Sequence, residues 1–162
     1  MKKIRILGLF ILVCTLPLLS AAVLAETGST TVQGSVPVSM TVSVPSTVQM
    51  PSLVPGMNVQ SAAQTVTVTT NSTNWSLSVA ESGGGSDGKM GNSNNATLMY
   101  AIQVKGGDLT GFQSLGPSAL TLKSGASGSA TINDIYFSQP VDGNEKVGTY
   151  YMTLVFTATA TQ

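Results

Sequence analysis

Residues 150–158 read Tyr-Tyr-Met-Thr-Leu-Val-Phe-Thr-Ala, a stretch in which large apolar side chains recur at every second position. In an extended chain, successive side chains point to opposite faces. Tyr150, Leu154 and Phe156 therefore share one face, and the threonine hydroxyls lie on the other. This period of two predicts a β-strand that is buried on one side only.

Six further segments repeat the pattern, separated by turn-forming runs rich in Gly, Pro, Asn and Asp, such as 51–58, the long polar loop 82–95 and residues 142–144. The segment 132–137 changes phase after Ile132, which indicates a β-bulge. Short strands at this spacing predict an all-β fold: a single antiparallel β-sandwich, immunoglobulin-like, of seven to eight strands. Besides 150–158, the expected strands are 36–44, 65–69, 75–79, 98–104, 120–122 and 132–137.

Charge and residue types exclude several functions. The 162 residues include 7 Lys plus Arg, 7 Asp plus Glu, no His and one Cys. Residues 26–162 carry four Lys, no Arg and seven acids, a net charge of −3. Without a basic cluster to displace phosphate counterions, binding to nucleic acid is not expected. Without His or Cys in this part, the chain lacks a His general base, a Cys nucleophile, a disulfide and the usual zinc ligands, so we expect no enzyme and no cofactor.

The first 25 residues have the three parts of a helical secretory signal peptide. Residues 1–5 contain two Lys and one Arg, residues 6–19 form an apolar run, and small residues allow cleavage after Ala25, with Ala22 as second choice. The apolar run is shorter than the ~20 residues that span a bilayer. We therefore expect a signal peptide over 1–25, a secreted surface domain over 26–162, and no membrane span after cleavage. Cys14 lies inside the apolar run, where lipidation is not expected.

Three stretches resemble the WxL-type surface domains of secreted proteins. Residues 69–79, which contain Trp75-Ser76-Leu77, resemble the first motif of the family, and residues 87–90 resemble its next segment. Residues 139–141 and 148–156 resemble its closing strand, with Leu154-Val155-Phe156 where the family has a second Trp-x-Leu. The resemblance implies a β-sandwich outside the cell that attaches non-covalently to cell-wall polysaccharide or peptidoglycan, or assembles with other surface proteins.

The phase of each strand separates core from surface aromatic residues. Tyr136 and Tyr151 are out of phase with their apolar neighbours, so we expect them on the surface as candidate contacts to a carbohydrate or a partner. Trp75 has the alternative role of a platform for a sugar ring. Tyr100 is in phase and expected inside. The predicted core and motif residues are Trp75, Leu77, Tyr150, Leu154 and Phe156.

Several short motifs have both a functional and a purely structural interpretation. Asn71, Asn74 and Asn95 begin Asn-x-Ser/Thr sequences and are candidate glycosylation sites in a host that glycosylates. Two Gly-rich loops offer oxygen donors of the kind calcium takes, but neither has the spacing of the twelve-residue calcium loop, so no metal site is expected. These donors are Asp87, Asn92, Asn94 and Asn95 in one loop, and Asp142, Asn144 and Glu145 in the other.

Three functions remain open. The first is a secreted, non-enzymatic cell-surface protein that binds wall polymer or other surface proteins. The second is a fibre or pilus-type subunit, because the alternating segment 36–44 precedes a Pro/Gly-rich hinge at 51–58 and matches the kind of strand that completes a neighbour's sheet. The third is a carbohydrate-binding module that uses Tyr136 and Tyr151.

Overall fold

The computed structural model describes residues 29–160, so the predicted signal peptide, its cleavage positions and Cys14 lie outside the described residues. Residues 29–35 contain no strand and are exposed, and the residues from Val36 onward form one compact unit. The described residues contain twelve strands and no helix, hence no helix of the length and hydropathy needed to cross a membrane. The all-β prediction is confirmed.

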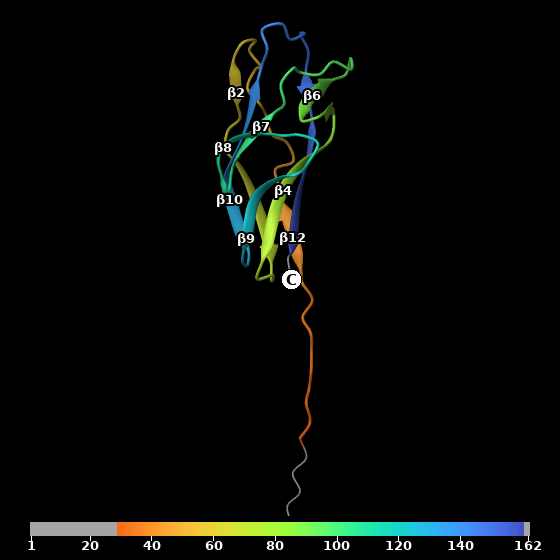
Figure 1. Cartoon of the computed structure of the whole chain (residues 1–162), viewed down its shortest axis with the longest axis vertical. Helices are drawn as coiled ribbons and strands as arrows, with labels where there is room; N and C mark the ends of the chain where they lie inside the picture. Colours follow the sequence, from red (N-terminus) through yellow and green to blue (C-terminus); the bar gives the residue numbers. More distant parts are fainter. Residues whose placement is uncertain (1–28, 161–162) are drawn as a thin grey trace, which may run out of the picture. The chain divides into compact units, whose positions relative to one another are not determined.

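The larger sheet has six strands, all antiparallel to their neighbours, and Figure 1 labels most of them. Five follow the order β1-β3-β10-β7-β8, and the sixth, β2, pairs with β10. Their bounds are β1 Met40–Ser43, β2 Asn58–Gln60, β3 Gln64–Thr70, β7 Gln103–Gly106, β8 Leu109–Ser114 and β10 Ala130–Pro140.

A second sheet has the order β12-β4-β9, with β4 Trp75–Gly83 at its centre, β12 Thr153–Ala160 on one edge and β9 Leu120–Ala126 on the other. This order differs from that of a constant-type immunoglobulin domain, whose three-stranded sheet is centred on the sixth strand. A third, small sheet joins β11 Tyr150–Tyr151, β6 Lys89–Asn92 and β5 Gly85–Ser86.

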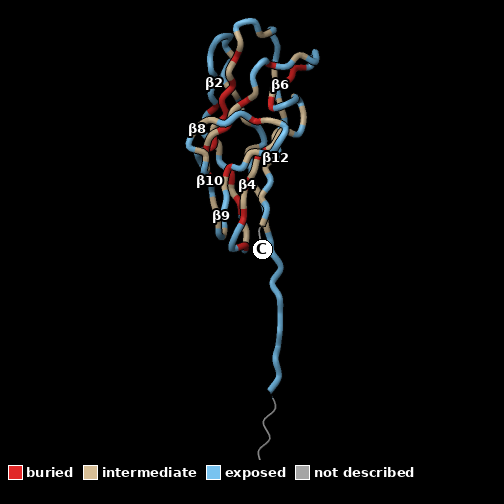
Figure 2. The backbone as a smooth tube through the Cα atoms, in the orientation of Figure 1, coloured by how far each residue is buried: buried red, intermediate tan, exposed pale blue. Residues whose placement is uncertain are grey.

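The core lies between the two main sheets. Val66 and Val68 of β3 and Leu77 of β4 are fully buried in one apolar cluster, and Figure 2 marks buried residues in the middle of the domain. Trp75 is also fully buried, and its indole Nε1 donates a hydrogen bond to the Gly128 carbonyl at 2.7 Å. The indole therefore fills the core without leaving its polar atom unpaired.

The bulge predicted in 132–137 is confirmed, because the pairing of β10 with β3 shifts register between Ile132 and Ile135. Ile132 and Ile135 both face the core although three positions separate them. The bulge inserts an extra residue and so restores the inward phase for Phe137, which is also buried.

The strands are more numerous and less continuous than expected. The predicted loop 82–95 contains β5 and β6, and the predicted strand 98–104 is a strand only from Gln103. The stretch 150–158 is interrupted at Met152, because β11 pairs with β6 whereas β12 pairs with β4. The expected strand 36–44 is reduced to β1, four residues long.

Candidate functional site

The predicted core residues differ in how deeply they are buried. Trp75 and Leu77 lie at the centre of the core and are fully buried. Tyr150, Leu154 and Phe156 pack against the same cluster but are only half-buried. The phenol of Tyr150 donates to the Lys146 carbonyl at 2.9 Å. Full burial of Trp75 argues against its alternative role as a sugar platform, since its ring is not accessible.

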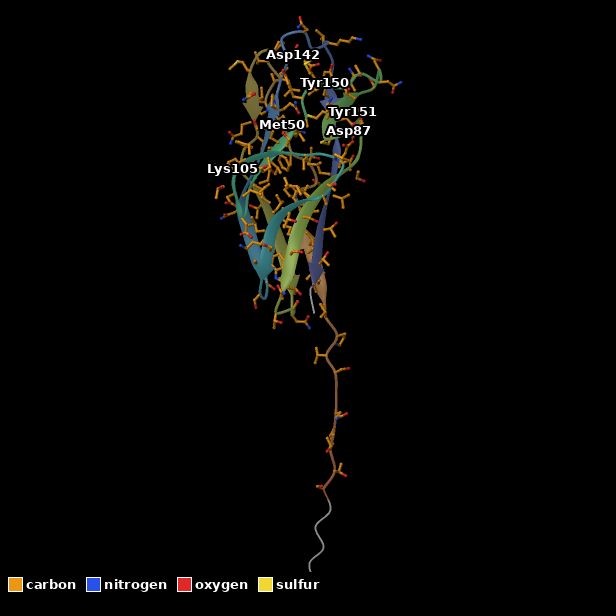
Figure 3. All side chains as sticks on the ribbon, in the orientation of Figure 1. Met50, Asp87, Lys105, Asp142, Tyr150 and Tyr151 are labelled. Carbon is orange, nitrogen blue, oxygen red and sulfur yellow. The ribbon has the colours of Figure 1, made fainter. Side chains whose placement is uncertain are left out.

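The structure does not bring the two predicted surface tyrosines together. Tyr136 is half-buried on β10 opposite Lys105 of β7, whereas Tyr151 is 51% exposed on β11 opposite Gly91 of β6. Figure 3 labels Lys105 and Tyr151 in separate parts of the domain. They belong to different sheets and do not form one aromatic platform. Tyr100, expected inside, is 46% exposed because residues 98–102 leave the sheet.

The two oxygen-rich loops are occupied by their own backbone contacts. Asp142 Oδ1 accepts the Asn144 N–H at 2.9 Å, and Glu145 Oε1 accepts the Met99 N–H at 2.6 Å. Asn92 Oδ1 likewise accepts two N–H groups of its own loop. Among residues 29–160, no group of three or more His, Cys, Asp or Glu is placed to hold a metal ion. Asn92 and Asp142 therefore act as turn formers, whereas Glu145 joins its loop to the segment that carries Met99.

A shallow depression of about 190 Å³ lies near Tyr150, lined in part by Leu53, Leu98, Val141 and Glu145. Ligand pockets for drug-sized molecules usually have ~300–1,000 Å³, so this depression is too small to serve as one. Nearby, Gln139 is fully buried and its Nε2 donates to the Tyr100 carbonyl at 3.0 Å, which fixes the loop that carries Tyr100.

One ion pair holds the turn between β7 and β8 against β9. Lys123 Nζ donates to Asp108 Oδ1 at 2.6 Å, and the Ser124 N–H donates to Oδ2 at 2.9 Å. These two hydrogen bonds hold the pKa of the Asp108 carboxyl below its usual value, the lysine having the larger effect. Both side chains are substantially exposed, so the pair fastens the turn at the protein surface.

Of the three candidate glycosylation residues, Asn71 has a structural task. Its Oδ1 accepts the Ser39 N–H at 2.8 Å, and its Nδ2 donates to the Pro37 carbonyl at 3.0 Å. Asn74 and Asn95 are exposed, and Asn95 has a positive φ of 58°. The amide of Asn71 therefore fixes the chain just before β1, a role that its sequence motif does not reveal.

The segment before β1 keeps the alternating pattern but forms no strand. Val36 is 85% exposed and Val38 is 46% exposed, although both are in phase with the inward-facing Met40 and Val42 of β1. These residues form no strand because their partner strand ends: Met40 pairs with Thr70, which is the last residue of β3. Residues before Met40 run past that strand and find no ladder there.

β12 is an edge strand of the second sheet. This eight-residue strand pairs with β4 alone, and β1 lies beside it without a hydrogen-bonded ladder. Figure 1 shows β12 along one side of the domain, with the orange β1 near its C-terminal end. The sequence predicts 150–158 as a strand buried on one side only. Along β12 the inward side chains shrink from Leu154 and Phe156 to Ala158 and Ala160, so the strand has few large side chains for a central position.

No family model matches the chain, and no curated protein matches it. Fold and site together define a class of molecule: a β-sandwich domain preceded by an alternating segment, residues 32–38, that pairs with no strand among residues 29–160.

Proposed function

We propose that this protein is a non-enzymatic structural subunit of an extracellular assembly, in which the N-terminal segment of one copy adds a strand to the next. The carrying observation is the exposure of Val36 and Val38 next to a strand whose pattern they continue. Among residues 29–160, no group of three or more His, Cys, Asp or Glu is placed to hold a metal ion, and the depression near Tyr150 is too small for a drug-sized ligand.

Both the backbone and the apolar side chains of this segment would gain partners in such an assembly. An isolated extended segment leaves its N–H and C=O groups to water and its valines exposed. Each Å² of apolar surface that stays in water costs ~25 cal/mol relative to the buried state. Adding that segment to the edge of another sheet pairs the backbone and buries every second side chain, which is the general mode of β-augmentation.

The test compares the exported protein with a variant lacking residues 29–36, which keeps β1 and the hydrogen bonds of Asn71 to Pro37 and Ser39. We expect the full-length protein to form oligomers or filaments in light scattering and electron micrographs. The deletion variant should remain monomeric with an unchanged melting temperature. A full-length protein that stays monomeric at high concentration, or a deletion variant that assembles equally well, would overturn the proposal.

Wall-polymer binding is the second candidate, favoured by the exposure of Tyr151 on the small sheet. Exposed aromatic rings stack on sugars through their apolar faces. Sedimentation with insoluble wall polysaccharide tests it: Tyr151→Ala should lose binding, and Val147→Ala, at another exposed apolar position of the described chain, should retain it. No sedimentation of the unmodified protein would exclude this role.

A further inference from the structure

We infer that the acceptor for the N-terminal segment is the outer edge of β12 at Thr153–Phe156 on a second copy of this chain. The inference rests on the proposed function and adds the site, the direction of the added strand and the geometry of the assembly.

The first step is the position of the free edge. Ala160 pairs with Trp75, and residues 71–74 connect Trp75 directly to Thr70, so the C-terminal end of β12 is level with the end of β3. β1 pairs with that same end of β3 and therefore flanks only the C-terminal half of β12. Within the described part of the chain, no strand pairs with the outer side of Thr153–Phe156.

The second step is the character of this edge. Natural proteins protect exposed edge strands with charges, proline or a very short length. β12 is eight residues long and reads Thr-Leu-Val-Phe-Thr-Ala-Thr-Ala, without charge or proline. Its inward-facing Leu154 and Phe156 are half-buried, whereas Leu77 and Val79 on the adjacent β4 are fully buried. The edge thus has no ladder partner among the described residues, and its inward side chains have apolar surface left to cover.

The third step is the match between segment and edge. No charged residue occurs between Glu26 and Glu81, so the segment brings no charge to a strand that has none. Its apolar positions Val32, Val36 and Val38 recur at even spacing, which places them all on one face when the segment is extended. That face would cover Leu154 and Phe156 at the open side of the sandwich.

The fourth step gives the direction. β1 is antiparallel to β3, and β12 is antiparallel to β4, the strand that follows β3 after a tight reversal. β1 therefore runs opposite to β12, and so do residues 36–39, which lead directly into β1. A second copy of the chain that is displaced along the strand direction would place its N-terminal segment antiparallel to β12. Segment and edge are different surfaces, so the contact is heterologous. A displacement along the strands, without a rotation that closes a ring, repeats this contact as a filament.

The direct test places a lysine on the proposed acceptor. Val155 points outward from β12 and is 45% exposed, so Val155→Lys should leave the fold intact while guarding the edge. The matched control is Thr121→Lys on β9, the opposite edge of the same sheet, where Thr121 is also exposed. We expect Val155→Lys to raise the concentration needed for assembly at least tenfold, and Thr121→Lys to leave it unchanged.

Cross-linking gives a second readout, because residues 26–162 contain no cysteine. Ser35 is out of phase with the valines, so an added segment would place it on the outward side of β12 with Val155. A short thiol cross-linker should convert the Ser35→Cys/Val155→Cys variant into a ladder of oligomers, and the Ser35→Cys/Thr121→Cys variant should give none.

The outcomes separate the two proposals. If the unmodified protein assembles but Val155→Lys assembles equally well and no ladder forms, the acceptor is elsewhere and only this inference fails. If the unmodified protein never assembles, the proposed function itself fails. Assembly that is blocked by Val155→Lys alone, together with the selective ladder, supports both.

Discussion

Asn71 holds Ser39 in place by accepting its backbone N–H at 2.8 Å, while the other end of the same amide donates to the Pro37 carbonyl at 3.0 Å. One side chain from the turn after β3 thus binds the backbone on both sides of Val38. This clamp fixes the direction in which residues 37–39 enter β1.

Replacing Asn71 with alanine should loosen β1. Two hydrogen bonds at an exposed position are lost, so we expect the free energy of unfolding to fall by about 1–2 kcal/mol. Urea denaturation followed by circular dichroism measures this. Asn74→Ala, with no side-chain hydrogen bond among the described residues, is the control and should stay within about 0.5 kcal/mol. Equal effects in both variants would contradict the clamp.

Trp75→Phe should destabilise the domain by about 2–4 kcal/mol, because it leaves a small cavity and deprives the Gly128 carbonyl of its 2.7 Å donor. Trp75 is the only tryptophan, so its fluorescence should be blue-shifted in the native protein and shift to longer wavelength on unfolding. Native emission typical of a water-exposed indole would show that the ring is not in the core.

Gly107→Ala should be among the most damaging glycine substitutions. Gly107 has a φ of +63°, and a Cβ at this position would overlap the Leu122 carbonyl of β9. We expect a loss of at least about 2 kcal/mol in unfolding free energy. Gly111→Ala on β8 has open space around the added methyl group and no positive φ, so its unfolding curve should nearly superimpose on that of the parent.

Asp108 should contribute to the pH dependence of stability. Its pKa is lowered in the folded protein by Lys123 and the Ser124 N–H, so its contribution is present above the unfolded value of about 3.9 and is lost as the pH falls through the lower folded value. Asp108→Asn should therefore lose less stability than the parent as the pH drops from 5 to 2.

The measurement is the urea midpoint against pH at low ionic strength. Because the pair is exposed, 1 M salt should shrink the difference between parent and variant. Parallel curves for the two proteins at low salt would show that Asp108 has no stabilising role.

The sequence predicted where most strands lie, but it did not predict which strands pair with one another. The period of two located β3, β4, β9 and β12, and the phase change after Ile132 located the bulge in β10. The hairpin of β5 and β6 was missed because it depends on a close approach: a Cβ on Gly85 would overlap the Lys89 carbonyl. A polar, Gly-rich segment gives no periodic signal for that.

The candidate site was only partly predictable for the same reason. The alternation of 36–44 pointed to a strand able to complete a neighbour's sheet, but where β1 begins depends on Thr70, the residue at which a distant strand ends. The exposed state of Tyr151 followed from its phase, whereas its separation from Tyr136 depended on which sheet each strand joins. Sheet assignment is a non-local property that residue patterns do not encode.

The pairing of β4 with β12 also sets the order of events in folding. The Ser78 hydroxyl donates to the Thr157 carbonyl across 79 positions of the chain. Such distant pairings make folding slow, because a long loop must close before any contact rewards it. Until the final residues are available, β4 lacks one of its two neighbours and the indole of Trp75 lacks part of its cover. A chain shortened by a few residues at its C-terminus would thus stall with its centre open.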